Sequence, residues 1–118
     1  MAAILVIDDD PDIRDLLKTT LESAGHDVFL ASHGRQGMEQ FRTIKPDLVI
    51  TDLFMPEQEG LETIKQLRTE FPELPIIAMS GKPTGGTMLT VAKRLGATAL
   101  LQKPFEPEQL FKAVEQAL

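Results

Sequence analysis

Five short runs of apolar residues recur along the chain, and each is followed by a stretch in which apolar residues lie three or four positions apart. Short runs rich in β-branched residues and bounded by turn-forming residues are typical of buried strands. The longer stretches are typical of helices with one apolar face. The predicted strands span residues 3–7, 28–31, 48–52, 75–80 and 98–102.

Proline, glycine and capping residues set the limits of the predicted helices. Asp10 suits the N-cap of a first helix that begins at Pro11, and Gly25 suits the position after its end. Pro107 opens the last helix, and the glycines of residues 81–86 indicate a flexible loop before the fourth. Methionines and phenylalanines are assigned to the core. The residues expected on buried helix faces are Ile13, Leu16, Leu17, Leu21, Met38, Phe41, Leu61, Ile64, Leu67, Met88, Val91, Ala92, Leu95, Leu110, Phe111, Val114 and Leu118.

Five strand–helix units with short connections predict a single α/β domain over residues 1–118. Right-handed crossovers place helices on both faces of a parallel sheet, so we expect a doubly wound, flavodoxin-like (βα)5 sandwich. Ligands of such sheets bind beyond the carboxyl ends of the strands. The second strand ends in Ala31 and Ser32, which offer little chemistry. We therefore predict the strand order 2-1-3-4-5, which places this strand at an edge.

The polar residues that follow the other four strands are expected to meet at one edge of the sheet. They are Asp8, Asp9, Asp52, Ser80 and Lys103. Burying an unpaired carboxylate beside a strand as apolar as the one that ends at Asp52 is costly. Two carboxylates about 4 Å apart repel each other by roughly 4 kcal/mol at an effective dielectric constant of about 20. Three converging acids therefore need a cation or raised pKa values, and a set of oxygens without His or Cys suits Mg²⁺.

The same residues have the chemistry of a phosphoryl-transfer site. Lys103 supplies a point charge for a phosphate, and the Ser80 hydroxyl supplies a hydrogen-bond donor. A carboxylate flanked by Mg²⁺ and an ammonium group attacks phosphorus to form an acyl phosphate. We assign Asp52 as this nucleophile.

Over essentially its whole length, the sequence resembles the receiver domain of two-component response regulators. No single motif is specific, but their order and their places at strand ends agree with the family. The matching segments are Val6-Ile7-Asp8-Asp9 with Arg14, Asp47-Leu48-Val49-Ile50-Thr51-Asp52 with Met55-Pro56 and Gly60, Ser80-Gly81, Leu95-Gly96-Ala97 and Lys103-Pro104-Phe105.

The resemblance implies a role for each site residue. Asp52 would accept a phosphoryl group from a phosphohistidine of a sensor histidine kinase or a histidine phosphotransfer protein. Asp9 and Asp52 would bind Mg²⁺ directly, together with the backbone carbonyl of Phe54, and Asp8 would assist through water. Lys103-Pro104 would be a cis peptide. The chain would be a phospho-acceptor that assists its own phosphorylation and dephosphorylation rather than an enzyme.

The sequence departs from the family pattern at positions that affect how phosphorylation changes the structure and how long the acyl phosphate lasts. Receivers commonly have Tyr or Phe three residues before the site lysine, where this chain has Leu100. We therefore expect phosphorylation to act through residues 81–86 and the start of the fourth helix. Phe54 and Lys82 occupy positions that tune the lifetime of the acyl phosphate, and the Phe54 ring is expected to slow its hydrolysis. The family's usual surface for a downstream protein combines the fourth helix, the fifth strand and the fifth helix.

Composition narrows the classes of partner. The chain has 42% hydrophobic and 25% charged residues and a net charge of -6, which is typical of a globular protein and disfavours binding to a polyanion such as DNA. No apolar run reaches the length of a membrane span, and the N-terminal segment lacks the basic residues of a signal peptide. The absence of cysteine fits the cytoplasm. We expect a cytoplasmic protein with no direct nucleic-acid or membrane partner.

Some polar residues have simpler interpretations. Asp10 and Asp12 are explained as helix-capping and first-turn acids. His26 and His33 are expected to be solvated turn residues. Gly81-Lys82 faintly resembles a phosphate-binding loop, but that loop needs glycine where position 76 is Ile, so we reject it.

Two other classes of function are weighed against a phosphorylated receiver. Asp8-x-Asp10 after an apolar strand superficially resembles the motif of haloacid-dehalogenase-type phosphatases, but Asp12 stands where that motif has Thr or Val. A receiver-like interaction module that acts without phosphorylation is the second alternative, and Leu100 permits it.

Overall fold

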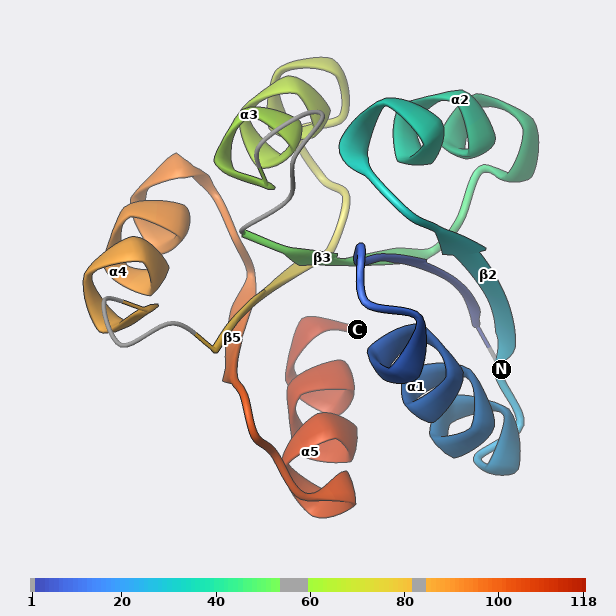
Figure 1. The fold of residues 1–118 in the computed structure, drawn as a ribbon. Helices are drawn as coiled ribbons and strands as arrows, with labels where there is room; N and C mark the ends of the chain where they lie inside the picture. Colours follow the sequence, from blue (N-terminus) through green and yellow to red (C-terminus); the bar gives the residue numbers. More distant parts are fainter. Residues whose placement is uncertain (1, 54–59, 82–84) are drawn as a thin grey trace.

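The computed structural model describes residues 2–53, 60–81 and 85–118, without the side chains of residues 85–89. Strands and helices alternate along the chain (Figure 1). The strands are β1 (Ala3–Ile7), β2 (Asp27–Ala31), β3 (Leu48–Asp52), β4 (Ile76–Ser80) and β5 (Ala99–Gln102). The helices are α1 (Pro11–Ser23), α2 (Gly34–Ile44), α3 (Gly60–Glu70), α4 (Gly85–Leu95) and α5 (Pro107–Ala117).

The strands form one parallel sheet in the order β2-β1-β3-β4-β5, as predicted. Helices α1 and α5 cover one face of the sheet, and α2, α3 and α4 cover the other (Figure 1). The predicted doubly wound sandwich is therefore confirmed. None of the described helices has the length and hydropathy needed to cross a membrane.

Two apolar cores lie on opposite faces of the sheet. Successive residues of β1 alternate between them: Ile4 and Val6 belong to the core under α1 and α5, and Leu5 and Ile7 belong to the other. All four side chains are fully buried. Because both faces are covered, every residue of the inner strands β3 and β4 is buried, and so are four of the five residues of β1. This explains why the strands appear in the sequence as continuous apolar runs rather than as alternating patterns.

The strand bounds differ slightly from the prediction. β2, β4 and β5 begin at Asp27, Ile76 and Ala99, one residue away from the expected starts. Thr98, expected to be the first residue of the fifth strand, instead uses its hydroxyl to accept a hydrogen bond from the Ile76 N–H (3.1 Å). Helix α4 begins within the loop predicted over residues 81–86, so the last two residues of that segment are helical.

Four apolar residues that we assigned to the core are exposed. Leu16 lies beside the buried stripe of α1 that contains Leu17, and it is 47% exposed. Phe29 is exposed on β2, which is an edge strand. Val91 on α4 and Leu118, which follows α5, are exposed as well. A helical period gives the direction of a side chain, but the neighbouring elements decide how wide a stripe they cover.

Capping residues include one confirmed and two corrected predictions. Asp10 caps α1, since its carboxylate accepts a hydrogen bond from a backbone N–H of the first turn (2.9 Å). The two histidines are half-buried and hydrogen-bonded, so the prediction that they are solvated was wrong. His33 Nδ1 accepts from the Gln36 N–H (3.2 Å) and caps α2, and His26 Nδ1 accepts from the Ala2 N–H (3.1 Å). Both rings satisfy backbone donors that the sheet and helix leave unpaired.

Candidate functional site

The acidic residues meet at the carboxyl edge of β1 and β3, as expected. Ile7 of β1 pairs with Thr51 of β3, which places Asp8 beside Asp52. Asp8, Asp9 and Asp52 each contribute a carboxylate oxygen to a group whose members all lie within 4.8 Å of one another. Asp8 is fully buried and Asp52 is 5% exposed, whereas Asp9 faces solvent. We call Asp8, Asp9 and Asp52 the acidic cluster.

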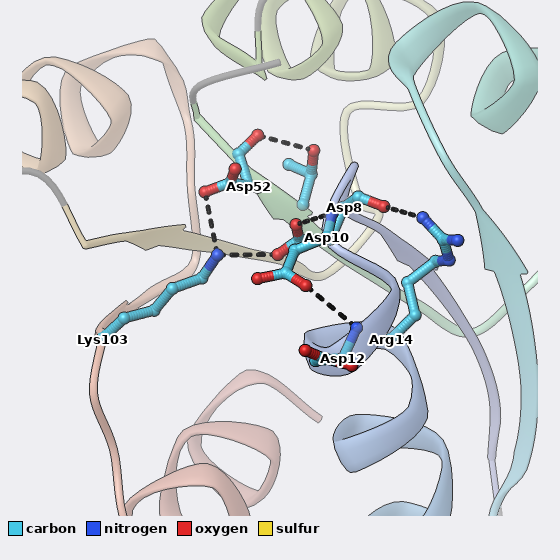
Figure 2. Close-up of polar contacts among 7 residues, drawn as sticks. Asp8, Asp10, Asp12, Arg14, Asp52 and Lys103 are labelled. Atoms are coloured by element: carbon cyan, nitrogen blue, oxygen red, sulfur yellow. Dashed lines mark hydrogen bonds and ion pairs between the residues drawn. The ribbon is translucent and has the colours of Figure 1, made fainter.

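Lys103 reaches the acidic cluster from the end of β5 (Figure 2). Its Nζ lies 2.7 Å from Asp8 Oδ2 and 3.4 Å from Asp52 Oδ1. The side chain passes Gly81, where an added Cβ would lie only 3.1 Å from Lys103 Cβ. Glycine at this position therefore leaves room for the lysine. The Lys103-Pro104 peptide is cis, as the family resemblance implied.

The charges of the site are incompletely balanced. Burial, and after it the charge of Asp8, raises the pKa of Asp52 from 3.8 to about 6, although Lys103 opposes the shift. Burial lowers the pKa of Lys103, but its hydrogen bond to Asp8 and the charge of Asp52 outweigh this, so its pKa lies above the usual value. Lys103 is therefore charged at neutral pH. One ammonium group does not fully compensate the carboxylates around it.

A chain of short hydrogen bonds fixes the turn between β1 and α1 (Figure 2). Asp8 Oδ1 accepts from the Asp10 N–H, and Asp10 Oδ1 accepts from the Asp12 N–H, both at 2.9 Å. Arg14 Nη1 donates to the backbone carbonyl of Asp8 at 2.7 Å. In the sequence Arg14 was only part of a family motif. The contact shows that it holds the backbone on which the acidic cluster is built.

Ser80 ends β4 with its side chain fully buried. Its hydroxyl has no hydrogen-bond partner among the described residues. A buried polar group without a partner costs about 1 to 3 kcal/mol. The backbone carbonyl of Ser80, by contrast, accepts a hydrogen bond from the Lys103 N–H at 2.8 Å. The Ser80 hydroxyl and the Lys103 ammonium group thus belong to residues whose backbones are hydrogen-bonded to each other.

Gly60 packs directly against the end of β3. Its N–H donates to the Leu53 carbonyl (3.2 Å). A Cβ at this position would lie 2.5 Å from Leu53 Cα and would also overlap the carbonyl oxygen of Asp52. The start of α3 therefore supports the backbone of Asp52. Sequence reasoning included Gly60 in a motif, but only the packing explains why a side chain is excluded.

The acidic cluster fits a hard divalent cation. It offers carboxylate oxygens alone, and burial, followed by the charge of Asp8, raises the pKa of Asp52 and so disfavours its ionised form in the absence of a cation. Mg²⁺ in proteins is usually held by one or two carboxylates together with waters and phosphate oxygens. Phe54, whose backbone carbonyl is the further ligand expected from the sequence, lies outside the described residues, as does Lys82.

Lys103→Met is expected to tighten Mg²⁺ binding about tenfold at pH 8, because the ammonium group competes with the cation for the carboxylates. Methionine keeps an apolar side chain against Gly81. Calorimetric titration is the suitable measurement, since the chain has neither Trp nor Tyr to report binding. Lys103→Arg retains the charge and should stay close to the wild-type affinity. Equal or weaker binding by Lys103→Met would show that the lysine does not compete with the metal.

Comparison with known proteins identifies the class to which this fold and site belong. A family model described as response regulator receiver domain matches residues 4–115. The match includes β1 from its second residue, the other four strands in full and the residues of the site. The chain belongs to the response regulator receiver family, and it is a phosphorylation-dependent signalling receiver. Proteins of this family are typically phosphorylated and bind Mg²⁺ at an acidic pocket.

Individual relatives include both longer regulators and single-domain proteins. The chain is 36% identical over 115 residues to the alkaline phosphatase synthesis transcriptional regulatory protein PhoP of Bacillus subtilis, covering 98% of this chain and 48% of PhoP. It is 32% identical to the chemotaxis protein CheY of Thermotoga maritima, covering 96% of this chain and 94% of CheY. The chain spans between 24% and 49% of the length of PhoP and of four other curated relatives that it matches.

Solved structures agree with the fold. The chemotaxis response regulator CheY4 of Vibrio cholerae superposes with a TM-score of 0.91 at 32% identity, covering 100% of this chain and 99% of CheY4. The receiver domain of NtrX from Brucella abortus gives a TM-score of 0.92 at 32% identity, covering 98% of this chain and 97% of that domain. The sequence-based fold class and family are thus confirmed.

Proposed function

We propose that residues 1–118 form one cytoplasmic receiver domain in which Asp52 accepts a phosphoryl group. The donor is a phosphohistidine of a sensor histidine kinase or a histidine phosphotransfer protein. The observation that carries this assignment is the surroundings of Asp52. Its buried carboxylate lies 3.4 Å from the Lys103 ammonium group, at the same edge of the sheet as the buried Ser80 hydroxyl, which has no partner within the described chain.

Asp52, Lys103 and Ser80 have different roles in the phosphoryl transfer. A carboxylate oxygen of Asp52 attacks phosphorus while the bond from phosphorus to the donor's imidazole nitrogen breaks, and that nitrogen keeps the electron pair. The product is an acyl phosphate on Asp52. Lys103 and Ser80 offer an ammonium group and a hydroxyl to the phosphoryl oxygens. The domain is an acceptor that assists this transfer and the later hydrolysis of its own acyl phosphate, and it has no separate substrate.

Mg²⁺ is assigned to Asp9 and Asp52, with the backbone carbonyl of Phe54 as a further ligand and Asp8 acting through water. Asp8 already binds Lys103 through Oδ2 and the Asp10 N–H through Oδ1, which favours an indirect role. The bound cation offsets the negative charge of the phosphoryl oxygens.

The face formed by α4, β5 and α5 is proposed to bind a downstream protein. Leu100 of β5 is 38% exposed on this face. A shallow cavity of about 320 Å³ lies between β5 and α5, next to Leu100, and it includes Gln102, Lys112 and Gln116. Leu100 carries no ring that could turn inward, so we assign transmission of the signal to residues 81–86, of which 82–84 lie outside the described chain.

Treatment with acetyl phosphate and Mg²⁺, followed by intact-mass measurement, tests the proposal. We expect one phosphoryl group per chain, with uptake lost when EDTA removes the metal. Borohydride reduction of the acyl phosphate followed by peptide mapping should place the modification at Asp52. Modification at another residue, or none at all, contradicts the assignment. Sustained release of phosphate from a simple phosphate ester would instead support the phosphatase alternative.

A further inference from the structure

A second hollow lies at the opposite end of the sheet from Asp52. It opens between the ends of α2 and α3, next to the residues that lead into β3 and β4, and its volume is about 670 Å³. Helices α2 and α3 lie side by side on this face of the sheet (Figure 1). We call it the basal groove, and it is lined by Phe41, Arg42, Lys45, Pro46, Asp47, Glu70, Phe71, Pro72, Glu73, Leu74 and Pro75.

The floor of the basal groove is apolar. Phe41, Pro46 and Leu74 are buried beneath it, and Phe71 and Pro75 are half-buried. The rings of Phe41 and Phe71 lie 4.5 Å apart between centroids at an angle of 44°. An apolar hollow of several hundred Å³ with a few polar groups at its edge is the usual form of a binding site. A volume of about 670 Å³ leaves room for a large apolar side chain together with the backbone on either side of it.

The rim of the groove carries opposite charges that come from different elements. Arg42 and Lys45 belong to α2 and its C-cap, and Glu70 and Glu73 belong to the end of α3 and the turn after it. Within the described chain, none of these four side chains forms an ion pair. Asp47, by contrast, is occupied, because its Oδ2 accepts from the Ala3 N–H at 2.8 Å. The rim therefore presents basic groups from one element and acidic groups from another.

The backbone around the groove is fixed without a ligand. Arg68 Nη1 donates to the carbonyls of Phe71 and Pro72 at 3.1 and 2.8 Å. Its Nε and Nη2 donate to the Gly96 carbonyl at 3.1 and 2.7 Å. On the other side, Lys45 ends α2 in the left-handed conformation, with φ 52°. A preformed groove loses little freedom when it binds.

We propose that the basal groove binds an extended peptide segment of a partner protein. The segment carries one aromatic side chain that enters the groove, with an acidic residue on one side and a basic residue on the other. The acidic residue meets Arg42 and Lys45, and the basic residue meets Glu70 and Glu73. This contact is separate from the phosphoryl site and from the face formed by α4, β5 and α5, so its failure would leave the proposed function untouched.

The test uses the peptide Ac-Glu-Gly-Phe-Gly-Arg-NH₂ titrated into the ¹⁵N-labelled protein and followed by NMR. We expect shifts concentrated at Phe41, Phe71 and Leu74, and binding at least about tenfold weaker when the peptide's Phe is replaced by Ala. A loss of tenfold corresponds to the removal of an anchor worth about 1.4 kcal/mol. Two control peptides carry either two Glu or two Arg flanks, and both should bind more weakly than the mixed peptide.

Reversing the basic part of the rim gives the sharpest check. In the double variant Arg42→Glu/Lys45→Glu, the peptide with two Arg flanks should become the preferred ligand and the mixed peptide should lose affinity. No shifts at the groove, or shifts indifferent to the peptide's Phe, would overturn the proposal. So would an unchanged order of preference in the double variant. Shifts of the same residues that grow with protein concentration alone would assign the groove to a second copy of this chain instead.

Discussion

Asp52→Asn is expected to take up no phosphoryl group from acetyl phosphate and Mg²⁺, and at pH 7 without divalent cations it is expected to be more stable than the wild type. The amide has nearly the shape of the carboxylate but lacks its nucleophilic oxygen. It also removes a charge that the fold disfavours. The same carboxylate is thus both the nucleophile that the function needs and the charge that destabilises the fold.

The direction of the stability change follows from the raised pKa of Asp52. The folded protein holds this proton with a pKa of about 6, against the usual value of 3.8. The stability that the protonated carboxyl contributes is therefore present below about pH 4 and is lost as the pH rises through 6. A shift of this size corresponds to on the order of 3 kcal/mol. Asp52→Asn does not titrate, so its advantage should grow across the same range.

Urea unfolding in EDTA, followed by circular dichroism between about pH 4 and pH 7.5, measures the difference. Asp15→Asn removes the same charge from an exposed position of α1 and serves as the control. Adding Mg²⁺ should reverse the order, because the metal binds the wild-type carboxylates and stabilises the folded state. A difference that stays constant over the range would mean that Asp52 carries no unfavourable charge.

Gly60→Ala is expected to lower the free energy of unfolding by about 2 to 3 kcal/mol and to slow phosphoryl uptake as well. The new Cβ would lie 2.5 Å from Leu53 Cα and would overlap the Asp52 carbonyl oxygen. These are backbone atoms of a fully buried strand end, so they move only by displacing Asp52 from its place in the site.

The control for this substitution is Gly34→Ala at the start of α2. Gly34 is also a buried first residue of its helix, so this variant adds the same methyl group at another helix start, and its phosphoryl uptake should match that of the wild type. Urea unfolding gives the stability, and the rate of mass increase in acetyl phosphate gives the uptake. Unchanged uptake in Gly60→Ala would mean that the start of α3 does not set the position of Asp52.

Much of the fold was predictable because the three inner strands are covered on both faces. Such strands appear as apolar runs, and parallel strands bring their following residues to one edge, which was sufficient to place Asp8, Asp52 and Lys103 together. The strand order followed from the same chemistry, since the second strand, whose end offers little chemistry, was expected to lie outside the site. The positions of the apolar runs and of the polar residues after them were therefore almost sufficient to predict the strands, their order and the place of the site.

What the sequence did not predict depends on contacts between distant elements. Leu16 and Phe29 have apolar side chains that no neighbouring element covers, and no local pattern reports the width of a helix–sheet contact. The two histidines were expected to be solvated because residues in turns are usually exposed to solvent. Their hydrogen bonds to backbone donors depend on where the β1 and α2 backbones end. The support that Arg14 gives to the Asp8 carbonyl is equally a matter of assembled geometry.

The hydrogen bond between Lys103 and Asp8 joins residues 95 positions apart in the chain. During synthesis the strand that leads to the lysine is the last of the sheet to emerge, while both aspartates of the buried pair are made long before it. A nascent or incompletely folded chain therefore has Asp8 and Asp52 but lacks the Lys103 ammonium group beside them. The ability to take up a phosphoryl group should therefore appear only when the last strand has docked, and it would distinguish finished molecules from unfinished ones.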